Sequence, residues 1–144
     1  MIVLDLMAGY SGAPLVKKLG IKPESALCVL NEPPNYRKLL APLPSGVELF
    51  RSLSPGADLV HIFSTSRAEL RLVLRKSLAT LRADAAVWIL WPKKASKVQT
   101  DITEDSIRAL ALPFGLVDIK VCAIDEIWSG LKLVVRKERR AGWI

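Results

Sequence analysis

The chain has 144 residues, of which 51% are hydrophobic and 24% charged, and its formal net charge at pH 7 is +7. This length suits one domain, and the high apolar fraction excludes an intrinsically disordered chain. No apolar run reaches the roughly 20 residues of a membrane-spanning helix, and the opening MIVLDLMAG lacks the basic start of a signal peptide. We therefore predict one cytoplasmic domain over residues 1–144 and no membrane contact.

Strand-like and helix-like segments alternate along most of the chain. The strand segments are short apolar runs bounded by turn residues, and Ser11, Ser66 and Thr103 are placed to cap helices. In chain order, the expected elements are a helix over residues 12–19, a strand over 26–31, a helix over 36–43, strands over 47–50 and 57–64, a helix from Ser66 to about Leu81, a strand over 85–91, a helix from Thr103 to about Pro113, and strands over 116–124 and 131–137.

This alternation predicts a three-layer Rossmann-like α/β sandwich with a mostly parallel sheet of about six strands. Only DEIWSG separates the last two strands, so we expect them to close the sheet as an antiparallel hairpin, because a parallel crossover needs a dozen or more residues. Residues 1–6 are expected to be an N-terminal extension and 138–144 a flexible tail. Cys28 and Cys122, in apolar runs, are predicted to be buried, reduced thiols.

The order of these parts resembles the class I S-adenosylmethionine methyltransferase fold. KKLGIKPESALCVLN is similar to its entry helix and first strand, ADLVHIFS to the strand before its catalytic loop, and LPFGLVDIKVCAIDEIWSGLKLVVRK to its closing hairpin. Such enzymes place a glycine-rich turn after the first strand, an acid after the second and a catalytic motif after the strand that resembles ADLVHIFS. This chain has Asn31-Glu32-Pro33-Pro34, Arg51 and Ser64-Thr65-Ser66 at those points, and it is one β-α unit shorter after VELF. Prolines remove amide donors, so we expect no cofactor bound in the usual way.

AGYSGAPLVKKLGIK, ADLVHIF, WPKKAS, TDITED and VCAIDEIWSGLKLV resemble a bacterial family of short proteins classed only as a domain of unknown function. The likeness runs from about Met7 to Arg136. It implies the same Rossmann-like fold and a bacterial cytoplasmic setting, it carries no catalytic residue over, and it suggests Met7 as the natural start.

Ligands of open α/β sheets bind beyond the carboxyl ends of the parallel strands. An anion such as a phosphate or carboxylate would suit the two lysines and the hydroxyls of WPKKAS, with helix N-termini at Ser66 and Thr103 adding partial positive charge. The alternative is a solvated loop that merely ends a strand. The candidate ligand-binding residues are Asn31, Ser64, Thr65, Ser66, Trp91, Lys93, Lys94 and Ser96.

Other chemistries find little support. His61 is the only histidine and lies in the middle of a strand, so we expect a core residue and not a general base. One histidine and two scattered cysteines make no metal site, and neither a dinucleotide fingerprint nor a P-loop occurs. Trp128 is expected to fold back over the sheet edge, although stacking on a base is an alternative.

Three functions therefore stay open. The first is a non-catalytic binding or regulatory module with an anionic or nucleotide-like ligand and no bound cofactor. The second is an atypical methyltransferase or another nucleotide-using transferase. The third is a protein that contacts RNA or DNA through basic residues, which requires Lys17, Lys18, the Arg67–Arg71–Arg75 stripe, Lys93, Lys94 and the C-terminal basic cluster 136–140 to share one face.

Overall fold

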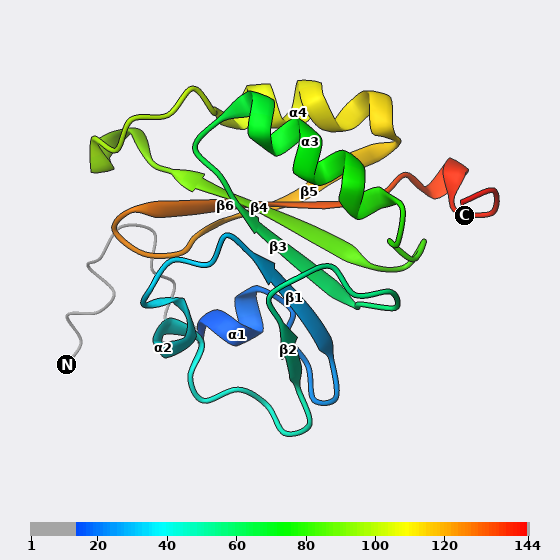
Figure 1. The fold of residues 1–144 in the computed structure, drawn as a ribbon, viewed down its shortest axis with the longest axis horizontal. Helices are drawn as coiled ribbons and strands as arrows, with labels where there is room; N and C mark the ends of the chain where they lie inside the picture. The colour runs from blue at the N-terminus through cyan, green and yellow to red at the C-terminus, as the bar shows by residue number, and fades with distance from the viewer. Residues whose placement is uncertain (1–13, 144) are drawn as a thin grey trace.

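The computed structural model describes residues 14–143, which form a central sheet covered by helices on both faces (Figure 1). The strands are β1 (Ala26–Leu30), β2 (Glu48–Phe50), β3 (Leu59–Phe63), β4 (Ala86–Pro92), β5 (Leu116–Ala123) and β6 (Trp128–Val135). The helices are α1 (Leu15–Lys18), α2 (Tyr36–Leu40), α3 (Arg67–Leu78) and α4 (Glu104–Ala111), with 3-10 turns η2 (Lys94–Ser96), η3 (Leu112–Phe114) and η4 (Lys137–Arg139). In Figure 1, α3 and α4 cover one face of the sheet, and α1 and α2 cover the other.

The six strands are ordered β2-β1-β3-β4-β6-β5. The first four are parallel to one another, and β6 pairs antiparallel with both β4 and β5. The predicted three-layer α/β class, the mostly parallel sheet and the closing antiparallel hairpin are therefore confirmed. β5 and β2 are the two edge strands, and residues 51–58 join β2 to β3 without a helix.

The two central strands explain why the sequence runs there are almost wholly apolar. Every residue of β3 and β4 is buried, because helices cover both faces. Alternate residues of β4 enter opposite cores: Ile89 packs in the cluster under α3 and α4, whereas Trp88 packs in the cluster under α1 and α2. Cys28 and Cys122 also lie buried in these two clusters as free thiols, and burial raises the pKa of each.

Helices α3 and α4 begin at the side-chain caps predicted from the sequence, and α2 and α3 end slightly earlier than expected. Ser66 accepts a hydrogen bond from the amide of Glu69 at the start of α3, and Thr103 forms a reciprocal capping box with Ser106 at the start of α4. α3 ends at Leu78 instead of about Leu81, and α2 ends at Leu40 because Pro42 disfavours a helical residue before it.

The first and last described segments of the chain are short helical elements. The Ser11 cap, the extension 1–6 and Met7 lie outside the described residues, and α1 is only four residues long. At the other end, where a flexible tail was expected, residues 137–139 form η4 and Trp143 packs against the core under α3. The indole Nε1 of Trp143 donates to the carbonyl of Leu81 at 2.8 Å, which joins this segment to the residues that follow α3.

Candidate functional site

The carboxyl ends of β1, β3 and β4 meet at one edge of the sheet, as parallel strands require. The Asn31 side-chain amide donates to the carbonyl of Phe63 at 3.2 Å, and the amide of Ser64 donates to the carbonyl of Leu90 at 3.0 Å. Lys93 directly follows β4 at the same edge. Residues from three distant parts of the sequence are thus brought together; that this edge binds an anion stays a prediction.

The hydroxyls of Ser64 and Ser66 and the carbonyl of Thr65 all have hydrogen-bond partners in the chain. Ser64 is buried, and its hydroxyl donates to the carbonyl of Ser66 and accepts from the Ser66 amide. The carbonyl of Thr65 accepts from the hydroxyl of Thr100 at 2.7 Å. These residues therefore shape the edge, and only Thr65 is well exposed to solvent.

The segment after β4 is a hydrogen-bonded turn. Trp91 is only 7% exposed and packs in the core under α3 and α4, so it differs from the expected ligand-facing role; its position in β4 points it to the same face as Ile89. The Ser96 hydroxyl donates to the carbonyl of Lys93 and closes the turn. Lys93 is half-buried and Lys94 exposed, and within residues 14–143 neither makes an ion pair.

The two helix N-termini near this edge already have partners from the chain. Asp101 accepts a hydrogen bond from the amide of Arg67 at 2.7 Å, so a carboxylate stands at the start of α3. At the start of α4 the Ser106 side chain accepts from the amide of Thr103. The expected contribution of these helix ends to an anion site is therefore taken up internally.

A separate pocket of about 350 Å³ opens beside the carboxyl ends of β1 and β2. Glu32, which follows β1, is its main charged group: only 14% of this side chain is exposed. Oε2 of Glu32 accepts from Nε of Arg37 at 3.2 Å, and Oε1 lies 3.8 Å from Nε of Arg51. Oε1 is buried and has no hydrogen-bond partner within residues 14–143. The pocket is lined by Val29, Asn31, Glu32, Pro33, Pro34 and Arg51.

The backbone at the mouth of this pocket turns through an asparagine. Asn31 has φ of 59°, in the left-handed region where asparagine is tolerated better than most non-glycine residues. Asn31 thus supplies the sharp turn after β1. Pro33 and Pro34 follow two and three residues later, and neither has a backbone amide that could donate to a ligand. A ligand here would meet side chains more than backbone amides.

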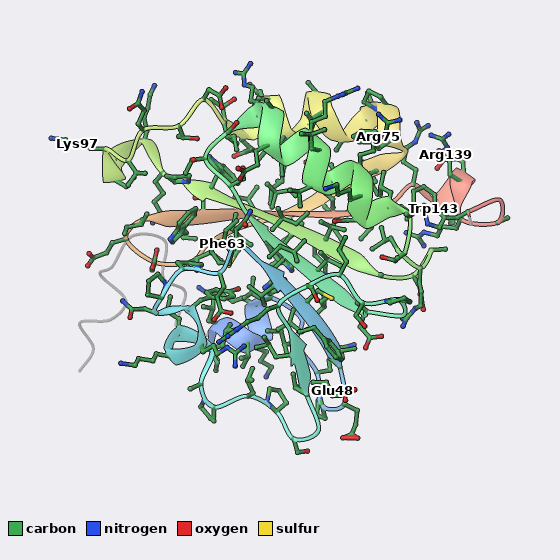
Figure 2. All side chains as sticks on the ribbon, in the orientation of Figure 1. Glu48, Phe63, Arg75, Lys97, Arg139 and Trp143 are labelled. Carbon is green, nitrogen blue, oxygen red and sulfur yellow. The ribbon has the colours of Figure 1, made fainter. Side chains whose placement is uncertain are left out.

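A line of aromatic rings supports the edge from below. Tyr36 and Phe63 pack edge to face with ring centroids 4.6 Å apart, and Phe63 packs in the same manner on Trp128 at 4.9 Å. Trp128 is half-buried opposite Pro92, so it folds back over the sheet edge. The side chains of the described chain are drawn in Figure 2, which labels Phe63 near the centre of the molecule.

His61 lies beneath this aromatic line and is fully buried. Burial lowers its pKa to about 3, so the ring is neutral at pH 7. Its Nδ1 lies 2.9 Å from the hydroxyl of Tyr36, and its Nε2 has no hydrogen-bond partner among the described residues. A core histidine fits these contacts. In residues 14–143 no group of three or more potential metal-binding side chains comes together.

The basic residues do not gather on a single face. Arg75 and Arg139 lie at one end of the molecule, whereas Lys97 lies at the opposite end (Figure 2). Lys17 and Lys18 belong to α1, on the other side of the sheet from α3 (Figure 1). This arrangement gives no support to the RNA or DNA interpretation, which required one continuous basic face. No helix in residues 14–143 is long and apolar enough to cross a membrane.

Several solved structures that share this fold are described as methyltransferases. One from Aquifex aeolicus is 15% identical, with a TM-score of 0.57 and 92% of both chains covered. A putative type 11 methyltransferase from Sulfolobus solfataricus is 13% identical, with a TM-score of 0.60 and coverage of 85% of this chain and 90% of that one. The O-methyltransferase NcsB1 from neocarzinostatin biosynthesis, solved with S-adenosylmethionine, is 11% identical, with a TM-score of 0.62; this chain covers 54% of its length.

These likenesses establish the methyltransferase-like fold. No protein-family model matches the chain, and no curated protein matches it. The methyltransferase-like pattern inferred from the sequence is thereby confirmed at the level of fold.

Proposed function

We propose that the protein is an atypical, nucleotide-using member of the methyltransferase fold and that it binds its ligand beside the carboxyl ends of β1 and β2. The carrying observation is the buried Oε1 of Glu32, which borders the pocket without a hydrogen-bond partner within residues 14–143. An unsatisfied buried acceptor costs about 1–3 kcal/mol, and more when charged. A hydroxyl or amino donor from a ligand would remove that cost.

A nucleotide-like ligand fits this place in the fold. Open α/β sheets bind ligands beyond the carboxyl ends of their strands, and an acidic side chain there holds ribose hydroxyls. Glu32, which follows β1, would supply this acid. Two proteins of similar structure, NcsB1 and LepI, were solved with S-adenosylmethionine, which is a nucleoside derivative. A ribose hydroxyl that donates to Oε1 of Glu32 would complete the carboxylate's hydrogen bonds.

Methyl transfer from S-adenosylmethionine is the specific candidate that the comparisons favour. Two features work against it: Pro33 and Pro34 remove amide donors near the cofactor position, and Arg51 stands where an acid is expected. If the chain binds a nucleotide but transfers no group, it is a binding module built on the same fold.

Isothermal titration calorimetry with S-adenosylmethionine, S-adenosylhomocysteine, ATP and NADP⁺ tests the proposal. At least one ligand should bind, and Glu32→Gln should weaken that binding about 10-fold or more, because a charge-assisted hydrogen bond becomes a neutral one. Glu48→Gln, at the opposite end of β2, is the matched control and should leave affinity within twofold. No binding at millimolar concentration, or equal loss in both variants, would overturn the proposal. Detection of methyl transfer from S-adenosylmethionine would select the methyltransferase.

A further inference from the structure

The guanidinium of Arg51 is the least committed charge at the pocket. Arg51 is the first residue after β2, and 74% of its side chain is exposed. Its single contact with a charged group in residues 14–143 is the 3.8 Å approach to Glu32, which is too long for a hydrogen bond. This guanidinium donates no side-chain hydrogen bond within residues 14–143, so its five N–H donors can bind a ligand.

The charges around the pocket leave a positive surplus. Glu32 carries one negative charge and already accepts a 3.2 Å hydrogen bond from Arg37. Arg51 adds a second guanidinium against the same single carboxylate, so the group of three has a net charge of +1. An anion placed beside Arg51 would balance this surplus without displacing Arg37 from Glu32.

The position of Arg51 indicates which part of a nucleotide it would meet. In open α/β sheets the residue after the second strand lies beside the ribose, where an acid accepts from a ribose hydroxyl or a nearby arginine donates to a ribose phosphate. A guanidinium can only donate hydrogen bonds, so it cannot accept one from a ribose hydroxyl. It does pair with phosphate oxygens through two parallel hydrogen bonds.

We infer that the ligand is a nucleotide with a phosphate monoester on its ribose, at the 2′ or 3′ position. Arg51 binds that phosphate, and Oε1 of Glu32 accepts from the neighbouring ribose hydroxyl. This inference rests on the proposed nucleotide binding and names its ligand class. It also accounts for the loss of the acid after β2, because a carboxylate there would repel the phosphate.

Calorimetry with adenosine, 5′-AMP, 2′-AMP and 3′-AMP tests the assignment on the full chain. 2′-AMP or 3′-AMP should bind about 10- to 100-fold more tightly than adenosine and 5′-AMP. Arg51→Gln should abolish that preference, so that this variant binds 2′-AMP and 3′-AMP no more tightly than it binds adenosine. Arg75→Gln, an exposed arginine on α3, is the matched control and should retain the preference. Unchanged thermal unfolding of both variants would show that the fold is kept.

The two ways of failing are distinguishable. If adenosine or 5′-AMP binds as tightly as the ribose phosphates, or if Arg51→Gln keeps the preference, the ribose-phosphate inference is wrong and nucleotide binding stands. If none of these probes, and none of the four ligands above, binds at millimolar concentration, both proposals are wrong.

Discussion

The hydroxyl of Tyr36 lies 2.9 Å from Nδ1 of His61, and both side chains are buried beneath the carboxyl edge of the sheet. The contact joins α2 to the middle of β3, within the same layer in which the indole of Trp88 donates to the carbonyl of Leu19. Burial raises the pKa of Tyr36 and lowers that of His61 to about 3, so both partners are neutral and the pair is a hydrogen bond without formal charge.

The free energy of unfolding should therefore decrease in acid, because His61 is held neutral in the folded protein. Between pH 6.5 and 3 the unfolded histidine binds a proton that the folded one does not, so the folded state loses stability as the pH falls through this window. Relative to His61→Gln, the parent should lose about 1.4 kcal/mol per pH unit between pH 6 and 4. Urea unfolding of both proteins at pH 7, 6, 5 and 4 measures this. A constant difference between them across these pH values would refute it.

The C-terminal segment should contribute measurable stability. Trp143 packs against the core under α3 and donates to the carbonyl of Leu81. Trp143→Ala should lower the free energy of unfolding by about 2 kcal/mol, and Trp143→Phe, which loses the hydrogen bond but keeps an aromatic ring, by about 1 kcal/mol. Glu138→Gln, an exposed neighbour, is the control for chemical denaturation. Equal stability of Trp143→Ala and the parent would show that the docking adds nothing.

Two glycine substitutions separate packing from backbone strain. A Cβ at Gly130 would lie 3.1 Å from the ring of buried Trp88, so Gly130→Ala should cost about 1–3 kcal/mol through overpacking. A Cβ at Gly56 meets nothing within 4 Å, but its φ of +83° makes Gly56→Ala cost about 1–2 kcal/mol through the backbone alone. Near-ultraviolet circular dichroism should change in Gly130→Ala and not in Gly56→Ala. The same spectrum in both would exclude repacking at Trp88.

The lysines after β4 provide a test of the anion edge. Replacing Lys93 and Lys94 by alanine should weaken the binding of phosphate-bearing ligands, because two positive charges leave the edge. The double variant should change stability by about 0.5 kcal/mol or less, as is usual for surface substitutions. Lys76→Ala with Lys137→Ala removes equal charge away from this edge and should leave affinity unchanged. If all anionic ligands bind the Lys93/Lys94 variant as tightly as the parent, the segment is a solvated loop.

The sheet could be predicted from local sequence signals, whereas the surroundings of the candidate site depend on contacts between distant residues. Continuous apolar runs over β3 and β4 and the short DEIWSG connection are local signals, and they sufficed for the fold. Trp91 was placed at the ligand edge because it ends a strand, but the alternation of side chains along β4 directs it to the core. The contact between Asp101 and Arg67 spans 34 residues, so no local pattern indicates that a carboxylate already stands at the start of α3.

The pairing of Glu32 with Arg51 shows the same limit. The unusual residues at both positions are visible in the sequence: two prolines follow Glu32, and the basic residue Arg51 follows β2. Their meeting across one pocket depends on the parallel register of β1 and β2, in which Cys28 lies opposite Phe50. This register is a property of the folded sheet, so only the folded chain brings the two side chains within 3.8 Å.

The end position of β2 in the sheet has a consequence for what the pocket would admit. Because no strand within residues 14–143 pairs with the outer side of β2, the wall beside Arg51 is open to solvent in the described part of the chain. Such a site selects its ligand by charge at one point and sets no upper limit on the ligand's size. A nucleotide at the end of a polymer, or one attached to a large molecule, would then fit as well as a free nucleotide. The rest of such a molecule would extend past the edge of the sheet.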